Sequence, residues 1–533
     1  MLKVRNKVLI FYIAVIFIIS FVLRYKLLFN YFVIDDYILV INNSFISSIS
    51  GLIEVLNPKN FFSVLPIRCG ARPFTIVSFV LDYHFFNLNP FGYHLINLIL
   101  HSINSCLLFL FCYNLKKDSK AFPFIVALFY SLHPIQTEVV NTISFRADLL
   151  LSLFSLTALN LINFFNIKTF ILNKKCLYLI IFLFVCFAFL SKENAIALPV
   201  IIFIYIYLFY KNNNLLKFSF ITFIVVISLF FFFWIERFPV PLYFSIYPSL
   251  PANFNPLANV TSYMYTLFTA LFYNILHVLY PVYLSVDYTL IFSKYIFVFA
   301  VLFIITIAYT LLYIKDKYIK FSLLALIIAY LPVSNLIPLV NTIADRYMYY
   351  PMIFISILFG LLVLKLKKFM SFKLLISFII LLLIVNTAIS YDRGIVYNNQ
   401  YSLYFDAIIK NPNHPRALYN MAIAYYDNKE YEKSLDLLNR LSNINPSYNR
   451  ELVWFIMGHN YKALKNNELA KQYYMKVFLL APQNQDFLDV FISMFPSVDS
   501  ALYYLLNNTK SLDDEIILSF QQYQKSQNTV EIK

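Results

Sequence analysis

The feature that most constrains this chain is a succession of apolar stretches, several of them 18 or more residues long. A helix of about 20 apolar residues is long enough to cross the hydrocarbon core of a bilayer. The mean hydropathy is +0.70 and 58 Phe and 43 Tyr occur among 533 residues, a composition far from that of water-soluble domains. The sequence therefore predicts a polytopic membrane protein. Its first apolar stretch, 7–23, lacks a small-residue cleavage site and is predicted to be an uncleaved anchor.

Charged residues predict how the spans are oriented. We expect eleven spans, near 7–23, 93–114, 122–138, 149–166, 176–190, 195–210, 218–235, 292–313, 321–337, 350–366 and 373–390. The N-terminus and every second connection together hold 18 Lys and Arg against two acids, whereas the opposite face holds 11 acids. Because lysine-rich connections stay in the cytoplasm, the N-terminus is expected inside and the C-terminus outside. The apolar stretch 257–280 is expected to be an outer-face or re-entrant helix, since another crossing would reverse every later lysine-rich loop.

The C-terminal part differs in composition, and the predicted domain boundary lies between residues 393 and 394. Residues 394–533 hold 13 Lys and Arg against 14 acids. Units end at Pro412, Pro446 and Pro482, at intervals of 34 and 36 residues, and small residues recur at matched positions such as Ser434 and Ala470. This spacing is typical of the tetratricopeptide helix–turn–helix. The predicted fold is therefore all-α: a membrane helix bundle, then a small extracytoplasmic solenoid whose concave surface binds peptide or protein partners.

Ionisable side chains gather at the predicted outer ends of the spans. Two adjacent acids, Asp35 and Asp36, follow the first span directly. The other candidates stand in later outer segments: Arg72, His94, His133, Glu138, Arg146, Asp148, Lys192, Glu193, Asp287, Asp345 and Arg346. Because charges near span ends normally face a protein cavity, we predict one pocket lined by both signs.

Two interpretations of this pocket are open. In the functional one, Arg146, Lys192 and Arg346 hold a lipid phosphate through charge-assisted hydrogen bonds, and an aspartate acts as general base on an acceptor hydroxyl. In the structural one, the same charges form ion pairs that fix helix ends. His94 is expected to pack in the interior, and the five cysteines have no metal-ligand spacing, so no metal or other cofactor is predicted. The basic excess indicates phospholipid contact and orientation signals, not nucleic-acid binding.

An ordered series of motifs resembles one known family. In chain order the motifs are DDY, RPFTIVSFVLDY, YHLINLILH, HPIQTEVV, FRADLL, SKEN, YLSVDY and ADRYMYYP, followed by the repeats. The set is similar to the transmembrane and tetratricopeptide-repeat O-mannosyltransferase-like proteins, which are polytopic GT-C glycosyltransferases. The resemblance implies inverting transfer of a sugar from a polyprenyl phosphate to an acceptor, such as a protein hydroxyl, on the outer face. It also implies a catalytic acid in the first outer loop, which maps to Asp35 or Asp36; the distance from the span favours Asp36.

Other functions fit parts of the sequence. Polymerases and ligases of lipid-linked glycans also carry such repeats, but they rely on a large late outer loop, and the late loops here are modest. A non-catalytic scaffold would display the repeats without using the acids. A transporter would show inverted repeats and charges near mid-bilayer, and the sequence has neither. We expect the protein in a bacterial cytoplasmic membrane or, in a eukaryotic host, in the ER membrane.

Overall fold

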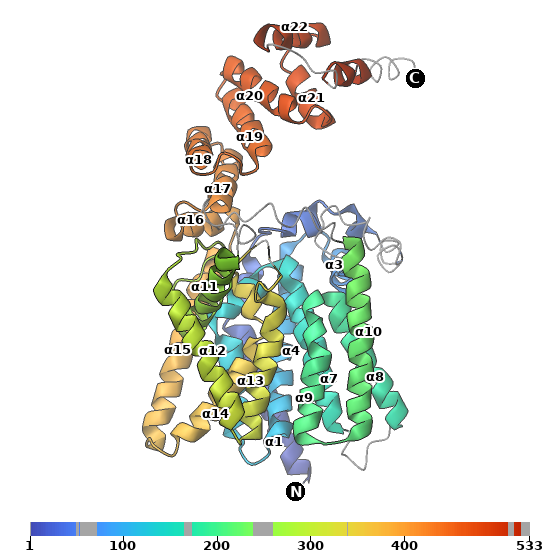
Figure 1. Ribbon diagram of the computed structural model, residues 1–533, viewed down its shortest axis with the longest axis vertical. Coiled ribbons are helices and arrows are strands. Elements are labelled where there is room, and N and C mark those ends of the chain that lie inside the picture. The colour runs from blue at the N-terminus through green and yellow to red at the C-terminus, as the bar shows by residue number, and fades with distance from the viewer. Residues whose placement is uncertain are drawn as a thin grey trace. The chain divides into compact units, whose positions relative to one another are not determined.

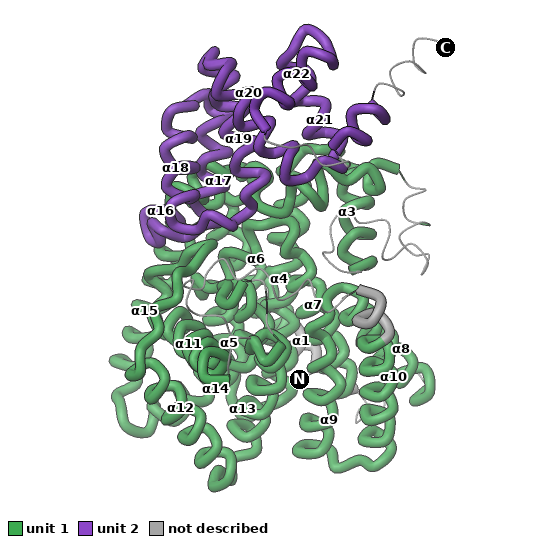
Figure 2. The backbone as a smooth tube through the Cα atoms, turned by 45° about the horizontal axis from the view of Figure 1, so that its top comes forward, with its two compact units in different colours: residues 1–406 green, residues 407–533 purple. Residues whose placement is uncertain are grey.

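The computed structural model describes residues 2–48, 53, 72–164, 173–237, 260–337, 339, 341–509 and 516–523. Within these ranges all regular structure is helical, which confirms the predicted all-α class. The chain divides into two compact units, residues 1–406 and 407–533 (Figure 2). The boundary expected from composition, between residues 393 and 394, lies earlier in the chain and stays a prediction.

Figure 1 shows that the long helices of unit 1 run side by side. The described α-helices of this unit are mostly apolar. They are α1 (Leu2–Val22), α3 (Pro73–Phe86), α4 (Pro90–Leu115), α5 (Ala121–Leu132), α6 (Thr137–Asn141), α7 (Arg146–Phe164), α8 (Lys174–Ser191), α9 (Ala197–Phe209), α10 (Asn213–Arg237), α11 (Val260–Leu279), α12 (Lys294–Tyr313), α13 (Lys317–Tyr330), α14 (Met352–Leu366) and α15 (Phe372–Val396). Each of the eleven predicted spans overlaps one of these helices, and the stretch expected to lie on the outer face contains α11.

Six helices in the described ranges are long and apolar enough to cross a membrane: α4, α8, α12 and α15 over their full length, Ile143–Asn163 around α7, and Asn213–Phe231 of α10. Further apolar segments are shorter, namely Lys7–Val22, Pro73–Phe86, Ala121–Leu132, Glu193–Phe209 and Met352–Leu366. The chain is thus a membrane protein. The number of crossings and their orientation stay predictions.

The helices differ in how deeply they lie in the bundle. In the apolar stretch of α4, 67% is buried by protein, and in the stretch around α7 the share is 78%. In α12 only 6% of the apolar stretch is buried. The first two therefore form the centre, and α12 presents its apolar surface outward, as a lipid-facing helix does. Close contacts also join the helices around this centre. Ser20 Oγ lies 2.5 Å from Ser131 Oγ, which links α1 to α5. A Cβ on Gly360 of α14 would come within 2.4 Å of Val126 of α5, so only glycine allows this approach.

Short helical turns join the long helices at one end of the bundle. They are η1 (Tyr25–Phe29), η2 (Tyr37–Ile41), η3 (Ser44–Ser47), η4 (Pro134–Gln136), η5 (Ile143–Phe145), η6 (Glu193–Ile196), η8 (Leu331–Val333) and η9 (Asp345–Met348). Local chemistry explains some of these boundaries. Pro134 takes the first position of η4, and His133 before it caps this turn by accepting a hydrogen bond from Ile135 N. Three of the candidate site residues, Glu193, Asp345 and Arg346, lie in these turns.

Unit 2 is built from helix pairs. Its helices are α17 (Pro415–Asp427), α18 (Tyr431–Ile444), α19 (Arg450–Ala463), α20 (Asn467–Leu480), α21 (Gln485–Ile492) and α22 (Val498–Asn508), and α16 (Gln400–Lys410) spans the boundary. Each helix from α17 to α20 packs on its neighbour in sequence, as in a solenoid. The small residues Ser434 and Ala470 are fully buried. The predicted repeat units therefore coincide with the α17–α18 and α19–α20 pairs.

Candidate active site

The loop that follows α1 contains a strained turn just before the two adjacent aspartates. Ile34 has a φ of 53°, in the left-handed region that β-branched residues rarely adopt. Residues in such conformations persist only where surrounding contacts hold them, and they cluster at functional sites. After this turn the chain enters η2, a single π-helical turn. The two aspartates thereby come into different environments.

Asp36 is fully buried, and its carboxylate accepts hydrogen bonds from backbone N–H groups. The donors are Val33 N at 3.0 Å, Ser144 N at 2.6 Å and Ile143 N at 3.4 Å. Burial raises the pKa of Asp36 to about 7, because these hydrogen bonds offset only part of the desolvation cost. Asp36 therefore ties the loop after α1 to the segment between α6 and α7.

Asp35 is partly exposed. Its backbone carbonyl accepts hydrogen bonds from Ile38 N and Leu39 N, so its main chain is fixed. Among the described residues, no hydrogen bond to its carboxylate is found. A carboxylate that is fixed at the backbone and open at the side chain can approach the proton of a substrate hydroxyl. Sequence position favoured Asp36 only through its distance from the span, whereas burial distinguishes the two carboxylates.

Arg146, at the start of α7, is fully buried in a network that joins three helices. Its Nη1 lies 2.5 Å from Asp82 Oδ2 of α3. Its Nε donates to Asn97 Oδ1 at 2.7 Å, and its Nη2 donates to Tyr93 O at 2.9 Å, both on α4. The guanidinium carbon also lies 4.9 Å from the centre of the Phe79 ring. Arg146 thus has a counter-charge and holds α3 and α4 to α7.

The SKEN turn between α8 and α9 contributes two further ion pairs. Lys192 Nζ lies 2.5 Å from Asp148 Oδ2 of α7, and both side chains are buried. Burial lowers the pKa of Lys192, although Asp148 opposes the shift. Glu193 accepts two hydrogen bonds from Arg72, from Nη2 at 2.6 Å and from Nε at 3.0 Å. This second pair is partly exposed, with 24% and 32% of the side chains accessible.

A third group of charges surrounds η9. Arg346 Nη1 donates to Glu138 Oε1 at 2.7 Å, and the backbone N–H of Arg346 donates to Oε2 at 2.6 Å. Next to it, Asp345 Oδ1 accepts a hydrogen bond from Tyr288 at 2.5 Å and lies 3.6 Å from His277 Nδ1. The structure therefore places Glu138, Asp345 and Arg346 together. Glu138 supplies the counter-charge of Arg346.

The remaining predicted pocket residues are buried. His133 Nε2 lies 3.0 Å from the carbonyl oxygen of Val278, and His94 and Asp287 are at most 3% exposed. Within the described ranges, no group of three or more His, Cys, Asp or Glu is arranged to hold a metal ion. Neither pocket lining nor phosphate binding by Arg146, Lys192 and Arg346 is tested by this geometry, and both stay predictions.

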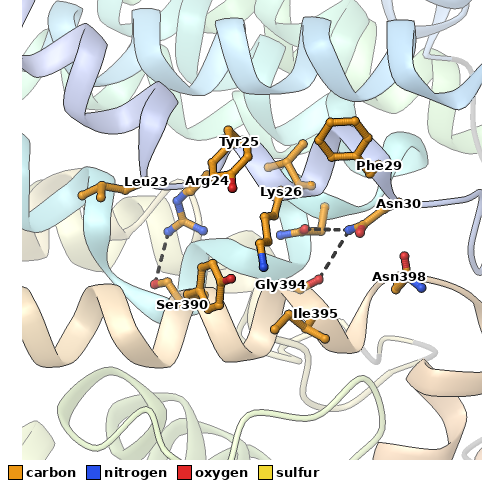
Figure 3. A pocket seen from close by; sticks show the side chains of 13 residues that line it. Leu23, Arg24, Tyr25, Lys26, Phe29, Asn30, Ser390, Gly394, Ile395 and Asn398 are labelled. Carbon is orange, nitrogen blue, oxygen red and sulfur yellow. Dashed lines mark hydrogen bonds between the residues drawn. The ribbon is translucent and has the colours of Figure 1, made fainter.

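The structure also brings forward residues that sequence reasoning did not select. Asp82 pairs with Arg146, and His277 lies beside Asp345. Arg24 and Lys26 line a cavity of about 350 Å³ between η1 and α15 (Figure 3). A sequence signal existed for the last two: they are basic residues directly after the first span, on the face where the positive-inside rule predicts few.

Comparisons with known proteins find similarity in both the repeats and the membrane part. The tetratricopeptide repeat family model matches residues 452–484, which covers α19 from its third residue on and all of α20. Protein O-mannosyl-transferase F38B6.6 of Caenorhabditis elegans is 26% identical over 429 residues, 76% of this chain and 59% of the relative. The resemblance to the O-mannosyltransferase-like proteins is confirmed.

Other relatives of that kind match shorter stretches. Protein O-mannosyl-transferase TMTC3 of Homo sapiens is 40% identical over 87 residues, 16% of this chain and 9% of the relative. Protein O-mannosyl-transferase tmtc2 of Xenopus laevis is 37% identical over 105 residues, 19% of this chain and 12% of the relative. The chain spans less than two thirds of the length of these O-mannosyl-transferases. No solved structure matches the chain.

Proposed function

We propose that this chain is an inverting membrane glycosyltransferase that moves a sugar, mannose first among the candidates, from a polyprenyl phosphate to a protein hydroxyl. The observation that carries the proposal is the pair of unlike aspartates on a strained turn at the end of α1. Support comes from the names of the relatives, which are protein O-mannosyl-transferases. The proposal includes the outer face as the place of transfer and the tetratricopeptide unit as the part that recruits the acceptor.

In this proposal Asp35 is the general base, which reverses the order favoured by sequence position. The Asp35 carboxylate takes the proton of the acceptor hydroxyl, and the hydroxyl oxygen forms a bond to the anomeric carbon from the face opposite the leaving group. The bond between that carbon and the phosphate oxygen breaks, and the polyprenyl phosphate leaves with the electron pair. One base is enough for such an inverting displacement. The partial exposure of Asp35 supports this role.

Asp36 then acts as a positioning residue. Its carboxylate is occupied by the N–H groups of Val33, Ile143 and Ser144, so it is not open to a substrate. By holding the turn at Ile34, it fixes the direction of the neighbouring side chain. Because burial raises its pKa to about 7, its charge, and with it the strength of these hydrogen bonds, changes near neutral pH.

The test is transfer by the purified full-length chain in nanodiscs. Polyprenyl-phosphate mannose labelled in the sugar is supplied with Ser- and Thr-containing peptides, and released lipid phosphate and glycosylated peptide are quantified. Asp35→Asn is compared with Asp36→Asn and with Asp118→Asn, an exposed aspartate in the predicted cytoplasmic loop before α5. We expect wild-type rates for Asp118→Asn and a loss of about 100-fold or more for Asp35→Asn, as for removal of a general base.

Each other outcome changes a specific part of the proposal. Full activity in Asp35→Asn would refute its role as base, and a dead Asp36→Asn beside an active Asp35→Asn would exchange the two roles. A product with retained anomeric configuration, determined by NMR, would refute inversion. No transfer by the folded wild-type chain with any sugar in a donor panel would refute the enzyme proposal and favour a scaffold.

A further inference from the structure

A polar cavity and an apolar groove meet at the outer end of α1. The cavity lies between η1 and α15, and its polar lining includes Arg24, Lys26, Asn30 and Ser390. Figure 3 shows Lys26 extending from η1 toward Gly394 of α15, with Arg24 directed at Ser390. Amide and hydroxyl groups beside two cations form a lining suited to an anionic headgroup.

The two cations of this cavity lack a carboxylate partner among the described residues. Arg24 is buried, and its hydrogen bonds go to neutral oxygens: Ser131 O, His133 O, Thr137 Oγ1 and Ser390 Oγ. Lys26 lies over the Tyr391 ring at 4.8 Å from its centre, and a hydrogen bond with that tyrosine raises the pKa of Lys26. Burial lowers the pKa of Arg24 to about 10, which still leaves it charged at neutral pH.

This pair differs from five other described cations of unit 1, each of which has a carboxylate partner. Those are matched with acids: Arg72 with Glu193, Arg146 with Asp82, Lys192 with Asp148, Arg346 with Glu138 and Arg393 with Asp406. A buried cation without a counter-charge is costly, so buried Arg24, with exposed Lys26 beside it, indicates that an anion completes the site. The acid that borders the adjoining groove, Asp392, is exposed and has no described contact with either cation.

The adjoining groove is apolar and follows α15. It has a volume of about 760 Å³, runs between α1, α5 and α15, and shares Leu23, Tyr25 and Tyr391 with the cavity. From Asp392 to Ile380 it follows α15 for about 18 Å, at 1.5 Å per residue. Ile380 and Ile384 are 52% and 60% exposed, so this wall faces outward toward lipid. An acyl or isoprenoid chain can lie here with its headgroup in the cavity.

We propose that the cavity and the groove together bind one single-chain isoprenoid phosphate, with the phosphate at Lys26 and Arg24 and the chain along α15. This site deepens the proposed function. It rests on that function only in one respect, that the bound lipid is the sugar donor or the lipid phosphate left after transfer. Lys26 makes the direct contact, because it is exposed and its amine carries three donors. Arg24, already hydrogen-bonded, supplies a fixed positive charge behind it.

The test measures binding rather than transfer. Full-length protein in nanodiscs is titrated with long-chain polyprenyl phosphate, and occupancy is quantified by native mass spectrometry. Separate arms use the neutral polyprenol, phosphatidylglycerol and inorganic phosphate. The variants are Lys26→Gln, which removes the charge, and Thr387→Trp, which fills the groove between α1 and α15. The matched control is Lys294→Gln, an exposed lysine at the start of α12 that also lies beside a tyrosine ring.

We expect Lys26→Gln to weaken polyprenyl-phosphate binding about 10-fold or more and to leave polyprenol binding unchanged. Thr387→Trp should weaken the binding of both polyprenyl phosphate and polyprenol. Lys294→Gln should bind both as the wild type does. Wild-type affinity in both Lys26→Gln and Thr387→Trp would overturn the site. Equal binding of phosphatidylglycerol would show a general anionic-lipid site, and tight binding of inorganic phosphate alone would show that the groove is not used; either result overturns the proposal.

The same samples separate this proposal from the proposed function. If the lipid binds as expected and no sugar is transferred, the site stands and the glycosyltransferase proposal fails. If sugar is transferred and Lys26→Gln leaves the KM for the donor unchanged, the enzyme proposal stands and the site is not that of the donor.

Discussion

Asp82 carries the counter-charge of a fully buried arginine, so replacing it by asparagine should destabilise unit 1 strongly. Asp82→Asn keeps the size of the side chain but removes the only carboxylate that contacts Arg146 among the described residues. The guanidinium would remain buried, with hydrogen bonds to Asn97 and Tyr93 but no compensating charge. The perturbation therefore tests whether this arginine is a structural member of an ion pair or a free ligand for a lipid phosphate.

The magnitude follows from the burial of the pair. Arg146 is 0% exposed at its side chain and Asp82 is 6% exposed, and removing one partner of a buried ion pair costs about 3–5 kcal/mol. Arg146→Met alone strands the carboxylate and should cost a similar amount. The double variant should be more stable than the sum of the two single effects by about 3 kcal/mol, because neither charge is then left alone.

Unfolding of the purified variants in detergent, followed by SDS titration, measures these effects, with Asp118→Asn as the matched control. Transfer activity and the KM for the donor are measured on the same samples. An Asp82→Asn variant as stable as wild type would refute the structural interpretation. Unchanged stability in Arg146→Met together with a raised donor KM would instead support phosphate binding by Arg146.

Two further predictions concern Asp36 and the repeats. Because the folded pKa of Asp36, about 7, lies above its usual 3.8, the wild type should lose up to about 4 kcal/mol of stability as pH rises from about 4 to 7. Asp36→Asn should lack this loss, and parallel melting-temperature curves for the two proteins between pH 4 and 8 would contradict the burial argument. In the repeats, Gly458→Ala should lower the melting temperature of unit 2 by an amount equivalent to about 1–3 kcal/mol, since its Cβ would lie 2.5 Å from the Tyr474 ring. Adding Tyr474→Leu, which copies the residues at the matching positions of the preceding repeat, Ala422 and Leu438, should recover part of the loss. No recovery would mean that the clash is not the cause.

Sequence reasoning succeeded where a pattern extends over many residues. Long apolar stretches located all eleven helices expected to span, because lipid-facing and buried positions are both apolar in a membrane bundle. The interval between Pro446 and Pro482 located the α19–α20 pair, since a solenoid repeats its helix contacts at a fixed spacing. The predicted ends of the apolar stretches also pointed to charged residues that cluster in the structure, such as Glu138 and Arg346.

The sequence alone does not establish which charged side chains form ion pairs. Arg146 pairs with Asp82, 64 positions earlier in the chain, and Arg346 pairs with Glu138 from a separate connection. Such pairings depend on how helices pack, which periodicity along one segment does not encode. For the same reason, sequence periodicity does not predict that Arg24 and Lys26 have no acid beside them in the described structure.

The adjacent aspartates Asp35 and Asp36 show the same division. The sequence by itself determined that two acids follow the first apolar stretch of an all-helical membrane protein with C-terminal repeats. Only the tertiary structure decided that Asp36 is enclosed by backbone N–H groups from the segment before α7, while Asp35 stays accessible. The physical reason is that adjacent side chains share a sequence position but not a direction, and burial is decided by the segments that pack around them.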